Sequence, residues 1–428
     1  MAKVAIIGAG AMGLAAAYHA VGKGHEVTVY EGDKVAGGMA AHFDFDGLSI
    51  ERFYHFVCKA DQPLFDLMAE LGIADKMVWR ETSMGYYVDG RHYSWGDPLS
   101  LLKFPLLSLS EKLRYGVQMF LQTKRKAFDD LENVNAKDWF VKWSGARAYD
   151  VLWRRLMELK FFEYADNISA AWISTRIKRI GTSRKSMLQE ELGVIDGGSQ
   201  TLVDALVNAI REKGGTIRLG LPVREVVVVD GKVTGVRTDE GAATCDNVIS
   251  TAPTPFISSL VPALPQASKD AYDAIRNIGV VCVLLKLRKP VTGHFWLNIN
   301  DPAIEIPGIV EFSNLRRLPD TVVYVPYYMP QTYPKFDKPS AFFVAEAMNY
   351  MRRLNPGIGE SDLIASHVGR LRHAQPVCEP GFQAKIPPVQ TPIEGLQIAD
   401  TCYYYPEDRG ISESVRFAKM MVDSISTR

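Results

Sequence analysis

The spacing of hydrophobic positions changes twice near the amino terminus. Val4 to Ile7 form a short apolar run that ends at Gly8, as expected for a parallel strand buried on both faces. From Met12 onward the apolar positions follow helical spacing, and residues 25–30 then alternate as a second strand. The pattern therefore predicts a strand, a helix and a strand that together form a βαβ unit.

The turn between the first strand and the helix has the sequence GAGAMG, which is the GxGxxG pattern in a strand–turn–helix setting. Gly8 permits the tight turn, Gly10 lets the backbone approach a pyrophosphate, and Gly13 lets the helix pack closely on the strand. The free amides and the positive end of the helix, at Ala11 and Met12, then face the phosphates. The turn predicts a dinucleotide site.

An acidic residue, Glu31, stands at the end of the second strand. A carboxylate at this position accepts hydrogen bonds from the ribose hydroxyls and repels a 2′-phosphate, so the sequence disfavours NADP. Gly37, Gly38 and Met39 follow soon after, where a plain NAD site usually runs into its next helix. A glycine pair lets the chain pass close to a second phosphate or to a ribityl linker.

Further elements follow from the same periodicities. Helical spacing predicts amphipathic helices over residues 63–76 and 201–215, with Ser199 as the cap of the second helix. A β-rich region then turns back on itself at Asp230–Gly231, which predicts a hairpin, and it ends in a strand over residues 247–250. These elements carry the chain back to the dinucleotide unit.

The βαβ unit, its terminal acid and the glycine pair resemble the superfamily of FAD-dependent amine oxidases, protoporphyrinogen oxidases and phytoene desaturases. Three later motifs extend the resemblance: WLNIND at 296–301, GIVEFSN at 308–314 and YPEDRG at 405–410. With them the chain is most similar to bacterial protoporphyrinogen-oxidase-like NAD(P)/FAD-dependent oxidoreductases. The resemblance implies FAD as the cofactor.

The resemblance also implies roles for individual positions. Val223 matches the family position whose backbone meets the adenine, and Asp400 matches the contact to the ribityl chain. Gly410 and Ile411 open a helix that the family aims at the pyrimidine end of the isoalloxazine. The chain departs from many relatives at Ala399, which stands where they have glycine before the aspartate.

The implied fold is α/β, with a Rossmann-like FAD-binding domain interleaved with an α+β substrate domain. A length of 428 residues suits two or three structural units. We expect residues 1–75, 191–255 and 386–428 to form the FAD-binding domain. Residues 76–190 supply the helical part of the substrate domain, and residues 256–385 supply its β-sheet part.

The chemistry is expected to lie with the flavin. No serine, cysteine or paired-carboxylate arrangement suggests hydrolysis, and no metal-ligand spacing is visible. The five scattered cysteines predict reduced thiols in a cytoplasmic protein. The resemblance implies hydride transfer to FAD in the dehydrogenation, oxidation or desaturation of a small or lipid-like molecule. Without a second GxGxxG, electrons leave to oxygen, a quinone, a redox protein or a docked carrier.

The loop ERFYHF, which begins at Glu51, contains the candidates for proton handling near the flavin. His55 is the first candidate and Arg52 the second, although a histidine between aromatic residues is also compatible with ordinary packing. Lys286 is near the position at which the amine-oxidase branch carries a lysine. The candidates for an aromatic substrate wall, each of which also suits core packing, are Trp296, Tyr324, Tyr327 and Tyr328.

Two other functions remain open at this stage. One is a flavoenzyme similar to UDP-galactopyranose mutase, which acts on a nucleotide sugar without net oxidation. It predicts that Arg316, Arg317 and Arg352 converge on a diphosphate. The other is a catalytically idle flavoprotein that serves as a binding subunit.

Charge and hydropathy limit the partners. Lys and Arg together number 49, as do Asp and Glu, so the net charge of zero argues against nucleic acid. No apolar run reaches the length of a spanning helix. Residues 99–126 carry many large apolar side chains and then a basic cluster, which fits a core helix pair, a lid over the cofactor or a membrane-facing patch. Peripheral membrane association stays open, as does the oligomeric state.

Overall fold

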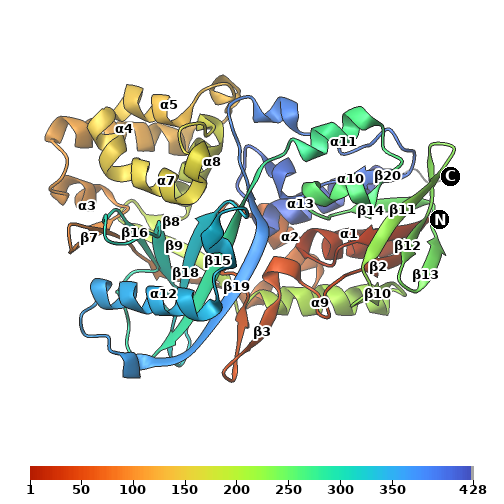
Figure 1. Cartoon of the computed structure of the whole chain (residues 1–428), viewed down its shortest axis with the longest axis horizontal. Helices are drawn as coiled ribbons and strands as arrows, with labels where there is room; N and C mark the ends of the chain where they lie inside the picture. The colour runs from red at the N-terminus through yellow and green to blue at the C-terminus, as the bar shows by residue number, and fades with distance from the viewer. Residues whose placement is uncertain (426–428) are drawn as a thin grey trace.

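The computed structural model describes residues 1–425 and confirms the α/β class. A five-stranded sheet, in which every neighbouring pair is parallel, forms one end of the molecule (Figure 1). Three separated stretches of chain supply its strands. In spatial order they are β10 (Thr216–Arg218), β2 (Glu26–Tyr30), β1 (Lys3–Ile7), β14 (Asn247–Ser250) and β20 (Leu396–Ile398).

Both faces of the parallel sheet are covered, because its apolar side chains alternate between two cores. Val4 and Ile6 of β1 face the first core, whereas Ala5 and Ile7 face the second. The first core is closed by the helices α1 (Ala11–Gly22), α2 (Gln62–Glu70), α9 (Ser199–Glu212) and α13 (Ile411–Asp423). The second is closed by strands β11 (Val223–Val229), β12 (Lys232–Thr238) and β13 (Gly241–Thr244) and helices α10 (Ile257–Leu260) and α11 (Gln266–Asp273).

A mixed sheet of seven strands forms the other half of the molecule (Figure 1). Helix α12 (Ser340–Leu354) covers one face, toward which Val281 and Val283 point, while Val280 and Cys282 point to the opposite face. Only the pair β16–β6 is parallel. In spatial order the strands are β19 (Leu363–Pro376), β15 (Asn277–Leu287), β18 (Thr321–Met329), β17 (Gly308–Glu311), β16 (Trp296–Ile299), β6 (Met84–Val88) and β7 (Arg91–Trp95).

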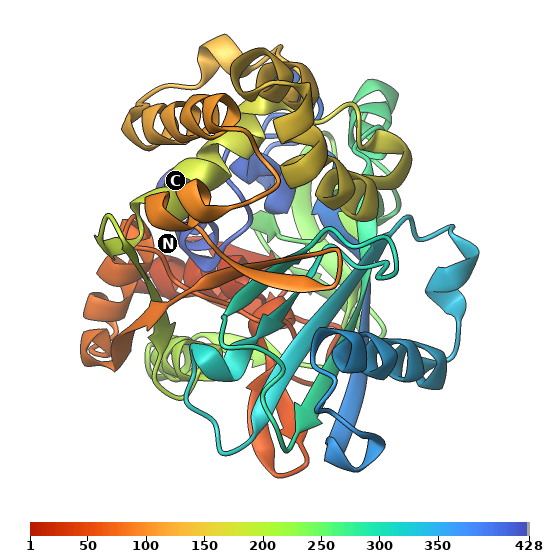
Figure 2. The ribbon, with the colours of Figure 1, turned by 90° about the vertical axis from the view of Figure 1, so that its left-hand side faces the viewer.

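A layer of helices lies across the uncovered face of the seven-stranded sheet, as Figure 2 shows from the side. It comprises α3 (Pro98–Lys103), α4 (Leu109–Lys124), α5 (Ala136–Ser144), α6 (Ala146–Tyr149), α7 (Arg155–Phe161) and α8 (Ala170–Thr182). Two small sheets join the halves: the hairpin β3 (His42–Phe45)–β4 (Leu48–Glu51), and the group β5 (Met77–Thr82), β9 (Gln189–Ile195) and β8 (Arg184–Ser186). Within residues 1–425 no helix combines the length and hydropathy needed to cross a bilayer.

The local predictions hold with two corrections. The hairpin at Asp230–Gly231 is confirmed, with positive φ at both residues. The predicted helix 63–76 ends earlier, at Glu70. Ser199 is the first residue of α9 and not its cap, because Gly198, with φ 80°, takes the cap position and the Ser199 hydroxyl donates to the Ala40 carbonyl at 2.6 Å. The domain boundaries stay a prediction.

Gly13 provides a stability test of the packing between α1 and β1. A Cβ at Gly13 would lie 1.9 Å from the Gly8 carbonyl oxygen, whereas a Cβ at Gly22, on the same helix, would meet nothing closer than 3.8 Å. We expect Gly13→Val to lower the free energy of unfolding by about 1–3 kcal/mol or more. Gly22→Val is the matched control and should change it little. Urea unfolding of both variants measures the difference, and equal effects would contradict the packing role of Gly13.

Candidate active site

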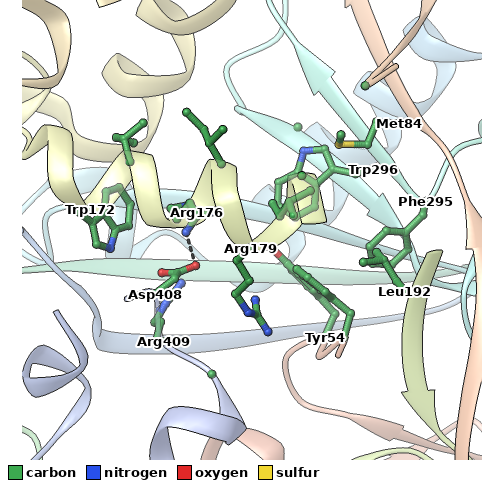
Figure 3. A pocket seen from close by; sticks show the side chains of 18 of the residues that line it. Tyr54, Met84, Trp172, Arg176, Arg179, Leu192, Phe295, Trp296, Asp408 and Arg409 are labelled. Atoms are coloured by element: carbon green, nitrogen blue, oxygen red, sulfur yellow. Dashed lines mark hydrogen bonds and ion pairs between the residues drawn. The ribbon is translucent and has the colours of Figure 1, made fainter. Parts of the chain in front are cut away.

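A cavity of about 1220 Å³ lies where the parallel sheet, the seven-stranded sheet and the helical layer meet. Its size exceeds the ~300–1,000 Å³ typical of a cleft for one small ligand, so it has room for a large cofactor together with a substrate. Figure 3 shows one part of its wall, with Trp172 and Arg176 at one side and Trp296 and Phe295 at the other.

Two helix N-termini open at the same end of this cavity. Gly10 precedes α1 and Gly410 precedes α13, and both glycines border the cavity together with Ala11, Met12 and Ile411. Neither helix has a side-chain cap, so the first backbone amides of both are free to bind an anion. The structure thus brings together residues separated by 400 positions of sequence at one anion-binding end.

The glycine pair completes this end of the cavity. Gly37 donates its amide to the Ala9 carbonyl at 2.7 Å, which holds the segment against the GxGxxG turn. A Cβ at Gly38 would lie 3.1 Å from the Gly10 Cα, so the two backbones approach each other as closely as glycine allows. Gly37 and Met39 border the cavity, whereas Gly38 supports the turn from behind.

The predicted acidic residues hold loops at the carboxyl edge of the sheet. Glu31 accepts from the Ala9 amide at 2.7 Å and the Asp33 amide at 2.8 Å. Asp400 borders the cavity and accepts from the amides of Thr254 and Cys402 at 2.7 and 2.8 Å. Both carboxylates therefore fix the conformation of the loops around the site by accepting hydrogen bonds from backbone amides.

The remaining predicted nucleotide residues lie around the cavity and do not border it. Gly8 and Gly13 lie under the turn, where each packs against the other and against Thr251. Val223 begins β11, and the segment before it bonds to the Glu31 loop through the Leu221 amide and the Glu31 carbonyl at 2.8 Å. These residues position the turn and the edge of the sheet.

An unpartnered hydroxyl supports a fit to FAD at this end. The Oγ of Ser412, on the first turn of α13, is buried, and it has no hydrogen-bond partner within residues 1–425. Its residue borders the cavity beside the two free helix N-termini. A dinucleotide with negative phosphates and many hydrogen-bonding atoms satisfies both features, so the residues present fit the cofactor.

Two of the four aromatic residues predicted for the substrate wall border the cavity. Trp296 and Tyr328 border the cavity, and Tyr54, which the sequence analysis did not select, stands edge-on to Trp296 with ring centroids 5.8 Å apart. Tyr324 lies behind Tyr54 and donates to the Glu51 carbonyl at 2.6 Å. Tyr327 points to the opposite face, where it packs against Phe343 and Tyr350 of α12.

The predicted place of Tyr324 and Tyr327 in the substrate wall is therefore wrong, because neither residue borders the cavity. The reason for Tyr327 is strand geometry, since successive side chains of β18 point to opposite faces of the sheet. Tyr328 faces the cavity, and its neighbour consequently faces α12. Tyr324 faces the cavity side but is covered by the ring of Tyr54.

His55 borders the cavity, and its Nδ1 has no hydrogen-bond partner among residues 1–425. Burial lowers the pKa of His55, so its imidazole is neutral at neutral pH and can accept a proton. Arg52 points away and pairs with Asp33, so the structure does not place it at the cavity. The structure thus does not support the prediction that Arg52 handles protons beside the flavin.

Glu51 is a buried structural carboxylate of the same loop. Its Oε1 lies 3.4 Å from His42 Nε2, and its Oε2 accepts from Arg316 at 3.1 Å. Burial raises the pKa of Glu51, but the hydrogen bond with His42 and the charge of Arg316 outweigh burial and the net pKa is lowered. The carboxylate joins the β3–β4 hairpin to the seven-stranded sheet.

The arginines expected to converge on a diphosphate do not meet. Arg316 pairs with Glu51, Arg317 is exposed, and Arg352 on α12 pairs with Glu360. None of the three borders the cavity. Lys286 also lies outside it, with Nζ 3.1 Å from an Asp46 carboxylate oxygen.

A cluster of four charged side chains, of which the sequence motifs mark only Asp408 and Arg409, lies in the cavity wall. Arg176 of α8 pairs with Asp408, and Arg409 follows directly (Figure 3). Lys160 of α7 is only 7% exposed and faces the rings of three aromatic residues. The YPEDRG motif marks Asp408 and Arg409, but Lys160 and Arg176 occur within ordinary helical sequence and carry no motif.

The parallel sheet, its glycine turn and the cavity that opens in front of the turn define an α/β protein of the dinucleotide-binding type. Residues 13–399 match the model of the family described as flavin containing amine oxidoreductase, so the chain belongs to that family. This confirms the resemblance drawn from the motifs. Membership implies FAD as the cofactor, in agreement with the glycine motifs.

Individual relatives are distant. Zeta-carotene desaturase of Solanum lycopersicum is 26% identical over 319 residues, covering 67% of this chain and 54% of the desaturase, so the chain spans about half the length of that curated relative. A putative protoporphyrinogen oxidase from Exiguobacterium has the same fold, with a TM-score of 0.76 at 18% identity over 99% of this chain and 98% of that one. Reduced UDP-galactopyranose mutase reaches 0.77 at 15% identity over 99% and 95%.

Ser412 tests the fit of the cofactor. Because its hydroxyl has no protein partner in residues 1–425, Ser412→Ala should leave the stability of the apoprotein unchanged but weaken FAD binding by about 1 kcal/mol, the net value of one hydrogen bond. Ser414→Ala is the matched control, since that hydroxyl bonds Tyr404 at 2.8 Å and Gly410 at 3.1 Å and its loss should lower apoprotein stability. Fluorescence titration with FAD and urea unfolding measure the two effects. Unchanged FAD affinity in Ser412→Ala would contradict the assignment.

Proposed function

We propose that the protein is an FAD-dependent oxidoreductase that removes a hydride from an apolar, lipid-like molecule. One observation carries the proposal: two uncapped helix N-termini open at one end of a cavity whose remaining walls are largely aromatic and aliphatic. The first feature suits the phosphates and the electron-rich end of a flavin. The second suits an apolar substrate that loses its hydride out of contact with water.

Each part of the wall has its own task. When bound, the flavin supplies the hydride acceptor. The amides after Gly10 and Gly410 would hold its negatively charged groups, and Tyr54 and Trp296 would exclude water from the cavity. His55 accepts a proton at Nδ1 when the substrate releases one together with the hydride.

The cavity favours this function over the two alternatives. The nucleotide-sugar alternative predicted that Arg316, Arg317 and Arg352 converge on a diphosphate, but none of the three borders the cavity. Of the cations that do line it, Arg176 is already paired with Asp408, and Lys160 stands among aromatic rings. An idle binding subunit gives no reason for a neutral, unpartnered imidazole at His55 inside the cavity. The electron acceptor in this proposal is oxygen, a quinone or a redox protein.

Anaerobic reduction tests the function. The purified protein should carry FAD, and an apolar substrate should bleach the oxidised flavin spectrum in the absence of oxygen. His55→Gln should keep its FAD but slow the bleaching by about 10²–10⁴-fold, the usual contribution of a general base. A colourless protein that does not take up FAD, or turnover of a sugar nucleotide by the reduced form alone, would overturn the proposal.

We also propose that the mouth of the cavity rests on a membrane surface. The mouth is bordered by exposed apolar side chains of α3, α4 and the turn after β8, namely Leu102, Leu113, Val117, Phe120 and Met187. Four further exposed apolar side chains extend this mouth patch: Leu99, Leu109, Leu121 and Leu188. An apolar surface of this kind around a ligand entrance marks a binding surface.

The charges around the mouth patch favour an anionic membrane surface as its partner. Lys103, Lys112, Lys124 and Lys126 surround it, and none has a carboxylate partner in the described part of the chain. A basic rim around an apolar face complements the anionic headgroups of a bilayer, into which the apolar side chains insert. A lipid-like substrate would then pass from the bilayer into the cavity without crossing water.

Vesicle sedimentation tests the membrane contact. The double substitution Val117→Glu and Phe120→Glu should abolish binding to vesicles that contain phosphatidylserine, because two carboxylates oppose both insertion and the surface potential. Phe342→Glu on α12, another exposed aromatic position, is the matched control and should bind as the native protein does. If the native protein ignores vesicles and instead dimerises through α4, a second copy covers the patch and the membrane proposal is wrong.

A further inference from the structure

The inner wall of the cavity carries more positive than negative charge. Lys160 on α7, Arg176 on α8 and Arg409 before α13 lie around one carboxylate, Asp408. Arg176 pairs with Asp408, whereas Lys160 and Arg409 have no carboxylate within ion-pair distance in residues 1–425. Asp408 can neutralise only one of the three cations.

Lys160 is held in place by aromatic rings. Its Nζ lies 5.1 Å from the ring centroid of Trp172, 5.2 Å from that of Tyr328 and 5.5 Å from that of Phe161. The guanidinium of Arg176 lies 5.0 Å from the same Trp172 ring. Figure 3 shows Trp172, Arg176, Asp408 and Arg409 grouped at one end of the cavity wall. The rings partly stabilise the cations but provide no counter-ion.

The hydrogen-bond partners of Arg409 are uncharged. It donates to the Ala374 carbonyl and lies 3.5 Å from the Tyr328 hydroxyl. The nearby pair of Arg179 and Asp61 is balanced and adds no net charge. Even if Lys160 turned toward Asp408, the cluster would keep an excess of positive charge. Within the described chain, the partly buried guanidinium of Arg409 lacks a carboxylate, and the buried amine of Lys160 has no carboxylate within ion-pair distance that would favour its charged form. An anionic ligand would supply the counter-ion that both lack.

We infer that Lys160, Arg176 and Arg409 form a subsite for an anionic oxygen group of the substrate, a carboxylate at one end of an otherwise apolar molecule. The apolar remainder would extend along the cavity toward the mouth patch. The inference deepens the proposed function, on which it rests, by giving the lipid-like substrate an acidic head. FAD is the other possible source of an anion, through its phosphates, and the test separates the two.

Binding at this subsite takes up a proton. Burial lowers the pKa of Lys160 well below its usual value, and Arg176 and Arg409 lower it further, while Asp408 and the Cys378 thiol oppose them. In the empty cavity the amine is therefore neutral at a pH at which an exposed lysine is charged. A carboxylate favours the protonated amine, so above the pKa of Lys160 the affinity should fall about tenfold per pH unit.

Calorimetry on the FAD-loaded protein tests the subsite with two probes of equal chain length, decanoate and decanol. We expect the protein to bind decanoate at least about tenfold more tightly, the effect of one hydrogen bond to a charged group. Lys160→Met should remove this preference, and Lys160→Arg should retain it while abolishing its pH dependence. Lys142→Met on α5, an exposed lysine that does not border the cavity, is the matched control and should behave as the native protein does.

The outcomes separate the two proposals. If the protein binds FAD but shows no preference for decanoate, the subsite is wrong and the proposed function stands. If Lys160→Met keeps the preference and loses FAD, the anion belongs to the cofactor and the inference is wrong. Decanol affinity in Lys160→Met reports whether the cavity remains folded. If the native protein takes up no FAD at all, the proposed function is wrong, and the subsite inference, which rests on it, is wrong as well.

Discussion

The architecture depends on the close approach of two glycine segments at the carboxyl edge of the parallel sheet. A Cβ at Gly38 would lie 3.1 Å from the Gly10 Cα, and Gly37 donates its amide to the Ala9 carbonyl. A side chain at Gly38 would therefore push the two segments apart. Because β20 joins the same sheet two strands from β1, α13 begins beside the opening in front of α1, and its free amides face the same cavity as those of α1.

The rest of the cavity combines an apolar lining with a cluster of charged side chains. Aromatic and aliphatic side chains give it a dry lining, yet Lys160, Arg176, Asp408 and Arg409 are set into one wall. In a dry lining electrostatic interactions are strong, so charges placed there select ligands sharply. The same cavity reaches the surface through apolar residues of α3 and α4. An acidic head and an apolar body satisfy both environments at once.

The strand, turn and helix that carry the glycine motif were predicted well because the motif is local. GAGAMG, Glu31 and the glycine pair act through backbone conformation within one βαβ unit, and strand, turn and helix follow directly from their order. The aromatic wall was predicted less well. Tyr327 and Tyr328 are neighbours in sequence, but only the register of β18 in its sheet decides which of them reaches the cavity.

Charged side chains were the least predictable. Arg52 and Arg316 looked available in the sequence, but the fold pairs them with Asp33 and Glu51. Lys160 looked like an ordinary helical residue, and its position is known only once α7 packs beside α8 and β18. The ion-pair partner of a long charged side chain can lie anywhere in the sequence, so no local pattern predicts it.

The sequence by itself therefore determined the class of fold, the family and the strand–turn–helix of the glycine motif, because each follows from short motifs and from the spacing of apolar residues within single elements. The tertiary structure decided which side chains line the cavity, which charges remain unpaired and where the cavity opens. These properties depend on strand register and on packing between α4, α7, α8 and the seven-stranded sheet. Contacts of that kind join residues hundreds of positions apart and exist only in the folded chain.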